Sequence, residues 1–259
     1  MPAPSPEPAP HGEARRRSDA HLFVGDLDAP VVDERDLHHL LRVLRLRRGQ
    51  SVSVADGSGR WRICTLQHTS GSPRPQADLE AASEVFAGRP CLPELTVAFA
   101  LPKGERPEWA LAKLTELGVD RIVPLVAARS VVRWEDRRAE RHRLRWAEVT
   151  RHAAMQSRRL RLPVIEDPTE VATVLGRDRG RAALALPGGD PPGLSRPTVL
   201  IGPEGGWAPD EEADAPATVG LGPQILRTET AAVVAASLLV ALRGGVVDER
   251  HRGGENHPT

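Results

Sequence analysis

The chain has 259 residues, and its 35 basic (Lys and Arg) and 35 acidic (Asp and Glu) side chains give a formal net charge of zero. This length allows a sizeable core and predicts two domains. The chain lacks the net positive charge typical of nucleic-acid-binding proteins, so any RNA-binding surface must come from local clusters of cations. Two cysteines exclude a disulfide framework, and an aromatic content of 3% without tyrosine argues against a base-stacking platform for single strands.

Both ends of the chain are polar. Residues 1–19 are rich in proline and charge and cannot bury a core. They contain no apolar segment of the signal-peptide kind, and the longest apolar run, residues 231–242, is too short to span a bilayer. We therefore expect a cytoplasmic protein with a disordered tail over residues 1–19 and a flexible tail over residues 247–259.

A small β-rich domain is predicted over residues 20–88. Alternation of apolar and polar residues predicts its strands, and glycine-rich or proline-rich segments predict its loops. The expected strands are residues 21–25, 51–55, 61–66 and 77–86. The second and third of these flank the segment Asp56-Gly57-Ser58-Gly59, which is typical of a hairpin loop.

One helix of this domain carries many arginines. It is expected to begin after Asp33 as N-cap and to end at Gly49, because leucines recur at helical spacing between them. Arginine makes forked contacts with phosphate oxygens, so Arg42 and Arg45 are the expected RNA contacts. A solvent-facing arginine side without any RNA explains the same pattern.

Residues 92–246 predict an α/β domain, because strand-like and helix-like segments alternate and so favour a parallel sheet. The expected strands are residues 95–101, 122–126, 162–165, 182–186, 198–201 and 217–221. Helices are expected after Pro107, with Trp109 on its apolar face, and over residues 134–157, 169–175 and from Thr230 onward. Residues 188–197 are expected to form a loop.

Two of these strands end in glycine-proline loops. Residues 198–201 stop at Gly202-Pro203, and residues 217–221 stop at Gly222-Pro223. Glycines in such loops let a ligand approach the backbone or allow positive φ. Loops that meet at the carboxyl ends of strands form the crevice in which open α/β sheets hold their ligands.

The segments IGPEGG (residues 201–206) and LGPQILRTETA (residues 221–231) resemble the SPOUT methyltransferases, most closely the RsmE-type 16S ribosomal RNA uracil-N3 methyltransferases. HHLLRVLRLRRGQSVSVADGSG (residues 38–59) is similar to the PUA-like N-terminal domain of that family. The resemblance implies a C-terminal trefoil-knot domain, a homodimer, and S-adenosylmethionine held by the two loops. The implied cofactor contacts are Gly202, Glu204 and Gly206 for the methionine half and Leu221, Gly222, Ile225 and Leu226 for the adenine.

Further matches to the family lie outside the two loops. Lys103, Arg129 and Arg158 fall in such segments and are expected to contact RNA. Arg158 also suits a contact with the cofactor, and Lys103 and Arg158 also suit exposed surface charges. Met155 stands where the family usually has a glutamate, so the role of that carboxylate is not carried over. Ala208 stands where the family commonly has a serine as helix N-cap, which weakens that helix start.

Methyl transfer to uracil N3 needs orientation, removal of the N3 proton and stabilisation of the charge left on O2 and O4. Arg227 and Glu229 adjoin the second loop and are the candidate catalytic residues. A helix-start glutamate near the positive end of the helix dipole, paired with an arginine, is the alternative reading of this pair. No metal-ligand spacing is visible, and we expect no metal.

The predicted function is S-adenosylmethionine-dependent methylation of uridine N3 in 16S ribosomal RNA of the small subunit. Ribose 2′-O methylation by a related knotted enzyme is one alternative, and a non-catalytic RNA-binding or ribosome-assembly factor is another. Binding of S-adenosylmethionine separates the enzymes from the assembly factor. A dinucleotide oxidoreductase is poorly supported, because no G-x-G-x-x-G segment follows a strand.

Overall fold

The computed structural model describes residues 9–68, 77–130 and 136–248. The chain divides into two compact units. The first contains the residues up to Pro90 together with Leu111–Glu116 and Ala139–Pro163, and the second contains Cys91–Ala110, Leu117–Arg138 and the residues from Val164 onward. The linear boundaries 20–88 and 92–246 stay a prediction, and we note that two later segments also contribute to the first unit.

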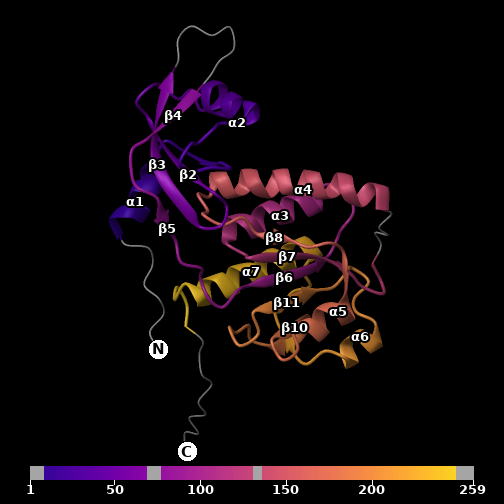
Figure 1. The fold of residues 1–259 in the computed structure, drawn as a ribbon. Helices are drawn as coiled ribbons and strands as arrows, with labels where there is room; N and C mark the ends of the chain where they lie inside the picture. The colour runs from indigo at the N-terminus through magenta and orange to yellow at the C-terminus, as the bar shows by residue number, and fades with distance from the viewer. Residues whose placement is uncertain (1–8, 69–76, 131–135, 249–259) are drawn as a thin grey trace, which may run out of the picture. The chain divides into compact units, whose positions relative to one another are not determined.

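The first unit is built on a five-stranded sheet (Figure 1). Its strands are β1 (Ala20–Phe23), β2 (Ser51–Ala55), β3 (Arg60–His68), β4 (Ala77–Ala81) and β5 (Phe86–Ala87). Strand β1 pairs with β2 in parallel, and the other pairs are antiparallel. The β2–β3 hairpin is confirmed, and its loop contains Gly57 and Gly59 at φ of 78° and 110°, where glycine is favoured. The strand expected over 77–86 is split into β4 and β5.

The predicted arginine-rich helix is shorter than expected. Helix α2 (Glu34–His38) begins after Asp33, whose Oδ1 accepts the N–H of Asp36 at 2.7 Å, which confirms the N-cap. It continues as a single π-helical segment, η1 (His39–Val43), and ends there instead of at Gly49. Leu46 explains the early end, because it is 8% exposed and its N–H donates to the Leu40 carbonyl as the chain turns back to bury it.

Residues 9–17 differ from the disordered tail expected over residues 1–19, since they form helix α1 (Ala9–Arg17); residues 1–8 lie outside the described residues. Contacts within the first unit stabilise this helix. The Arg15 guanidinium lies 5.8 Å from the centroid of the buried Trp61 ring. The Arg158 Nη1 donates to the Arg15 carbonyl at 3.0 Å and to Ser18 Oγ at 2.6 Å. A cation–π contact and hydrogen bonds therefore order a segment that has little apolar surface.

His21 is a buried titratable group in the same unit. It is 4% exposed, with Nε2 at 2.7 Å from the Arg159 carbonyl and Nδ1 at 2.8 Å from Ser53 Oγ. Because a carbonyl only accepts, Nε2 carries the proton and Nδ1 accepts from the Ser53 hydroxyl. Burial lowers the pKa of His21 to about 4 from an ordinary 6.5, with the nearby charges of Arg15 and Arg158 adding to the effect.

We expect acidification to destabilise the fold through His21. The pKa of His21 is lower in the folded protein than in the unfolded chain. Between pH 6.5 and 4 the unfolded chain therefore binds the proton more readily, and the free energy of unfolding decreases as the pH is lowered. The free energy of unfolding should drop by about 2 kcal/mol from this group between pH 7.5 and 5, measured by urea titration. The variant His21→Gln should show a flatter profile, and exposed His152→Gln should keep the native slope. A slope unchanged by His21→Gln would contradict the assignment.

The second unit contains a seven-stranded sheet of β6 (Thr96–Ala100), β7 (Arg121–Val126), β8 (Val164–Ile165), β9 (Thr169–Glu170), β10 (Ala182–Asp190), β11 (Thr198–Ile201) and β12 (Thr218–Val219). The order is β12-β10-β11-β6-β7-β8, with β9 also paired to β7, and every pair is parallel, as predicted. Strand β10 extends to Asp190, whereas residues 188–197 were expected to form a loop. The extension needs the backbones of Gly189 and Gly220 to lie close together, which is possible because neither has a side chain. A Cβ on Gly189 would lie 2.6 Å from the Val219 carbonyl carbon.

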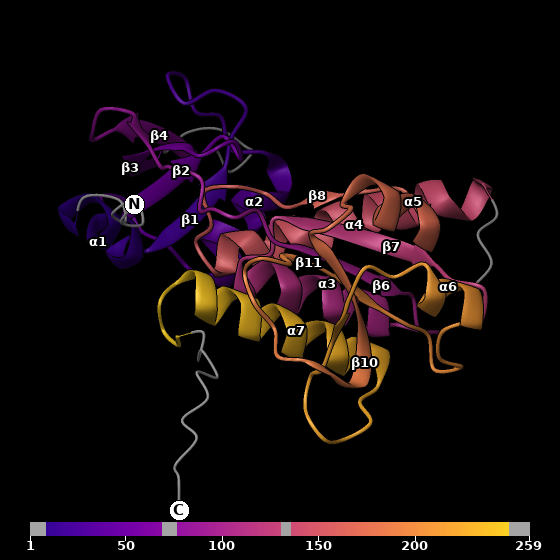
Figure 2. The ribbon, with the colours of Figure 1, turned by 90° about the horizontal axis from the view of Figure 1, so that it is seen from below.

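The helices are α3 (Arg106–Leu117), α4 (Asp136–Gln156), α5 (Val171–Arg177), α6 (Pro209–Ala213) and α7 (Thr228–Arg243). In the second unit, α7 packs on β6 and β11 and α5 packs on the other side of the same strands (Figure 2). Trp109 of α3 was expected to face the core but is 48% exposed, whereas Ala110, Leu111 and Leu114 are buried. In the described part of the chain, no helix combines the length and apolarity needed to cross a bilayer.

Candidate functional site

The two glycine-proline loops of the second unit line one cavity of about 400 Å³. One loop follows β11, the other lies between β12 and α7, and the end of β10 completes the wall. All seven residues expected to bind the cofactor line this cavity: Gly202, Glu204, Gly206, Leu221, Gly222, Ile225 and Leu226. Their role in binding stays a prediction, but the structure brings them together at the carboxyl ends of the strands.

The floor of the cavity requires glycine. A Cβ on Gly202 would lie 2.9 Å from Cε2 of Trp207, which is 4% exposed and donates its indole N–H to the Ala185 carbonyl at 3.2 Å. The Gly202 carbonyl also accepts from Thr228 Oγ1 at 3.0 Å, which joins the first loop to the start of α7. A side chain at position 202 would therefore displace either the loop or the indole. Gly206 and Gly222 have φ of 70° and 126°, which disfavour other residues.

The cavity wall is mostly apolar with charge at its edge. Its apolar side chains include Leu186, Ile201, Leu221, Ile225 and Leu226. Ile225 is 93% exposed, which is unusual for a large aliphatic side chain inside a hollow and suits a site that an apolar ligand surface covers. Glu204 and Arg227 supply the charged groups of the lining.

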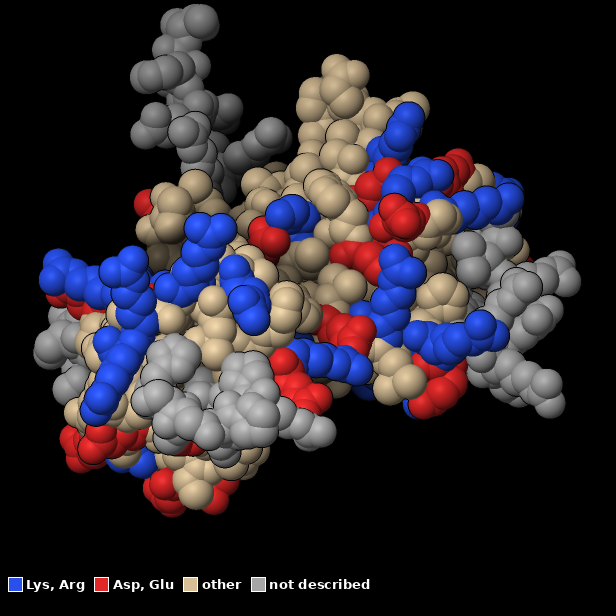
Figure 3. All heavy atoms as spheres, turned by 90° about the horizontal axis from the view of Figure 1, so that it is seen from above, with Lys and Arg blue, Asp and Glu red and all other residues tan. Residues whose placement is uncertain are grey.

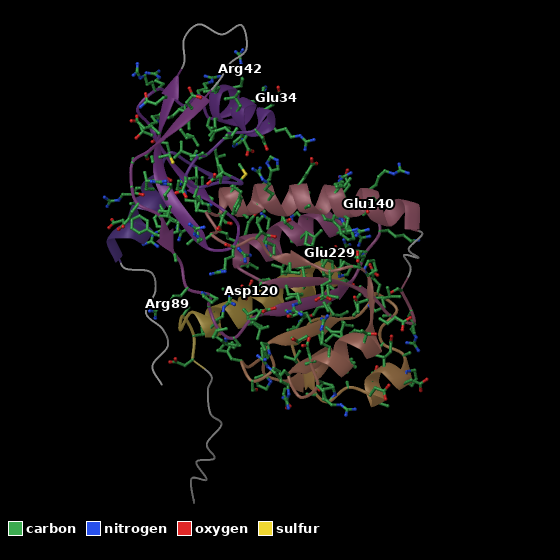
Figure 4. The ribbon with its side chains drawn as sticks, in the orientation of Figure 1. Glu34, Arg42, Arg89, Asp120, Glu140 and Glu229 are labelled. Atoms are coloured by element: carbon green, nitrogen blue, oxygen red, sulfur yellow. The ribbon has the colours of Figure 1, made fainter. Side chains whose placement is uncertain are left out.

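The two candidate catalytic residues differ in environment. Arg227 is the exposed N-cap residue of α7 and lines the cavity, and its side chain forms no hydrogen bond or ion pair with another described residue. Glu229 lies at the beginning of α7 (Figure 4), and only 9% of its side chain is exposed. Its Oε2 is buried and has no hydrogen-bond partner among the described residues.

Arg106, which sequence reasoning missed, lies beside Glu229. Its Nη1 is 3.6 Å from Glu229 Oε1 and 3.7 Å from Glu204 Oε1. Arg106 begins α3, just after β6, which is the neighbour of β11 in the sheet. Its position after the carboxyl end of a central strand was the signal that would have identified it, as it identified Lys103.

The five predicted RNA contacts are divided between the two units, and their role stays a prediction. Arg42 and Arg45 are exposed on and after η1 of the first unit, and Figure 4 shows Arg42 there. Lys103 and Arg129 are exposed in the second unit, where the Arg129 Nη1 donates to the Gly205 carbonyl at 3.0 Å and so supports the first loop. Arg158 belongs to the first unit and is engaged with Arg15 and Ser18, as described above.

Basic and acidic side chains are mixed on the surface. Figure 3 shows Lys and Arg side chains interspersed with Asp and Glu over one face of the molecule. Among the described residues, no group of three or more His, Cys, Asp or Glu side chains is placed to hold a metal ion.

A family model described as an RNA methyltransferase domain matches residues 90–240, and one described as an RNA methyltransferase PUA domain matches residues 32–73. The ribosomal RNA small subunit methyltransferase E of Mycobacterium bovis is 36% identical over 222 residues, covering 79% of this chain and 83% of that protein. The chain belongs to the RsmE family of RNA methyltransferases. The RsmE protein of Bacillus subtilis is 32% identical over 226 residues, covering 79% of this chain and 86% of that protein.

Solved structures agree with the family. A probable rRNA methyltransferase from Porphyromonas gingivalis has a TM-score of 0.74 at 26% identity, covering 88% of this chain and 100% of that one. The RsmE structure from Neisseria gonorrhoeae, described as bound to S-adenosyl methionine, has a TM-score of 0.68 at 25% identity, covering 87% and 97%. The predicted fold class, an α/β SPOUT methyltransferase domain with a small β-rich PUA-like N-terminal domain, is confirmed for this RsmE family member.

Proposed function

We propose that the protein transfers the methyl group of S-adenosylmethionine to N3 of a uridine in 16S ribosomal RNA of the small subunit. The observation that carries the proposal is the cavity between the two glycine-proline loops of an RsmE family member, with a buried carboxylate beside it. Membership of that family favours rRNA methylation over a non-catalytic assembly factor. The buried acid suits a target that must lose a proton when it is methylated, as uracil N3 must.

The residues present fit S-adenosylmethionine. The apolar wall, with the exposed Ile225, suits the flat adenine and the ribose, and we assign recognition of the base edge to the backbone of Leu221, Gly222, Ile225 and Leu226. The glycines of the first loop leave the backbone open to the methionine half, next to the carboxylate of Glu204. When bound, the cofactor supplies a methyl group made electrophilic by its sulfonium charge.

The protein's own residues then have to orient the uracil and manage its proton. Uracil N3 carries a proton at neutral pH, and the buried, unpaired Oε2 of Glu229 is the acceptor that we assign to it. As the N3–H bond breaks, negative charge develops on O2 and O4 of the ring. Arg227, whose guanidinium is unpaired among the described residues, is positioned at the cavity to stabilise that charge.

The exposed arginines of the first unit should contribute to RNA affinity. We expect Arg42→Ala with Arg45→Ala to raise the KM for small subunits roughly tenfold and to reduce the slope of log affinity against log salt by about 2, because two phosphate contacts are lost. The kcat should change little. Filter binding at several salt concentrations measures this, with exposed Arg16→Ala as control. An unchanged salt slope would remove both residues from the RNA-binding surface.

The partner and the compartment follow from the same proposal. Helix α7 leaves several apolar side chains only half-buried, among them Val233, Val234, Leu238 and Val240. A second copy of the chain covering them would make the homodimer that we propose, and light scattering at working concentration tests it. We propose that the enzyme acts in the cytoplasm and needs no metal.

The decisive test is transfer of labelled methyl to small ribosomal subunits that lack the modification, with the product nucleoside identified by mass spectrometry. We expect 3-methyluridine. A 2′-O-methylated nucleoside would keep the fold and overturn the target atom. Absence of transfer to a subunit that the protein binds would support the assembly-factor alternative.

A further inference from the structure

One guanidinium nitrogen lies between the carboxylates of two separate segments around the cavity. The Arg106 Nη1 is 3.6 Å from Oε1 of Glu229, at the start of α7, and 3.7 Å from Oε1 of Glu204, in the loop after β11. Both distances exceed those of good hydrogen bonds and are those of ion pairs. The cation therefore contacts both carboxylates through charge without saturating either of them.

The two carboxylates have different needs for this cation. Glu204 is 46% exposed, so water solvates it, whereas Glu229 is 9% exposed. A charge buried to this degree requires a compensating partner. Arg106 supplies the one ion pair found for Glu229 among the described residues, and it does so at Oε1. The other oxygen, Oε2, is buried and accepts no hydrogen bond from the described part of the protein.

A carboxylate with one oxygen in an ion pair and the other without a hydrogen-bond partner keeps the capacity to accept a proton from a ligand. We propose that Arg106 is a positioning residue for methyl transfer, which holds Oε1 of Glu229 so that the buried Oε2 stays unpaired for the N–H group of the target base. This inference rests on the proposed function. The Arg106 guanidinium acts through Glu229 and does not itself contact the reacting atoms.

The test is a double-mutant cycle on the full-length protein. Arg106→Gln and Arg106→Lys are made in the native protein and in Glu229→Gln, and kcat on unmethylated small subunits, the Kd for S-adenosylmethionine and the thermal midpoint are measured. Arg196→Gln is the matched control: Arg196 is equally exposed at 42%, makes one ion pair, with Asp190 at 3.9 Å, and does not line the cavity.

We expect Arg106→Gln to lower kcat roughly 10–100-fold with the Kd changed less than about threefold, and Arg106→Lys to recover most of the loss. In the Glu229→Gln background, Arg106→Gln should change kcat by less than about threefold, because the group it positions is gone. If Arg106→Gln does not fold, Arg106→Met, which also removes the charge, provides the same comparison in the two backgrounds.

Two results would overturn the role of Arg106. Multiplicative losses in the double variant would show that Arg106 acts independently of Glu229. A parallel loss in kcat and cofactor affinity would make it a binding residue that acts through Glu204. Failure of the native protein to make 3-methyluridine would instead reject the proposed function, so the two failures are distinguishable.

Discussion

Replacing Glu229 by glutamine should lower kcat for uracil methylation by roughly 10²–10⁴-fold, the usual contribution of a positioned general base. The change keeps the shape of the side chain and removes only its ability to take a proton. Because Glu229 does not line the cavity, the Kd for S-adenosylmethionine should stay within about threefold of the native value. Isothermal titration gives the affinity, and labelled methyl transfer gives the rate.

The same substitution should not destabilise the protein. Only 7% of Glu229 is exposed, and its Oε2 has no partner among the described residues. Removing the charge therefore removes the free-energy cost of its desolvation. We expect the thermal midpoint to be unchanged or raised. Glu212→Gln on the surface of α6 is the control and should leave both rate and midpoint unchanged. A native kcat in Glu229→Gln would exclude it as the base.

Replacing Gly202 by alanine should abolish cofactor binding at micromolar concentrations. The added Cβ would lie 2.9 Å from Trp207, which is buried and held by its hydrogen bond to Ala185, so the loop itself must move. We expect a loss of about 1–3 kcal/mol in stability, as for other overpacked sites. A displaced loop should weaken S-adenosylmethionine binding roughly 100-fold or more, equivalent to about 3 kcal/mol.

Gly176→Ala in α5 is the matched control, because a Cβ there meets no atom within 4 Å. It should leave cofactor affinity unchanged and stabilise the helix by up to about 1 kcal/mol. Trp207 lines the cavity, so its fluorescence reports binding in both variants. Native affinity in Gly202→Ala would show that the indole yields, and that the first loop tolerates a side chain.

The features predicted well are those with a local cause. Glycine and proline stop β11 where the sequence indicates, and the Asp33 cap starts α2, because each effect depends on a few adjacent residues. The parallel sheet also follows from local alternation of strands and helices. The residues of the two loops meet at one cavity since parallel strands place their carboxyl ends at the same edge.

The features that were missed depend on distant residues. Arg106 and Glu229 are 123 positions apart, and although each lies near a segment that marks the site, no local pattern joins the two as an ion pair. The composition of residues 9–17 predicts disorder, whereas contacts with Trp61 and Arg158 order them as helix α1. Leucine spacing carried the predicted helix past Val43, whereas burial of Leu46 turns the backbone away, leaving Leu44 43% exposed. Tertiary packing overrode local preference in each case.

The first unit has a consequence for biosynthesis. His21 bonds to Arg159, and Asp36 binds the Arg151 guanidinium at 2.9 Å and 2.5 Å, so contacts of its N-terminal residues await a segment that ends at Pro163. A ribosome must therefore extend the chain well into the methyltransferase region before the PUA-like part can close. The first unit can close once Pro163 has been made, whereas the second unit needs the chain to extend through α7. A fragment cut at Pro90 would lack the contacts that Arg151 and Arg159 make with the strand residues Phe23 and His21.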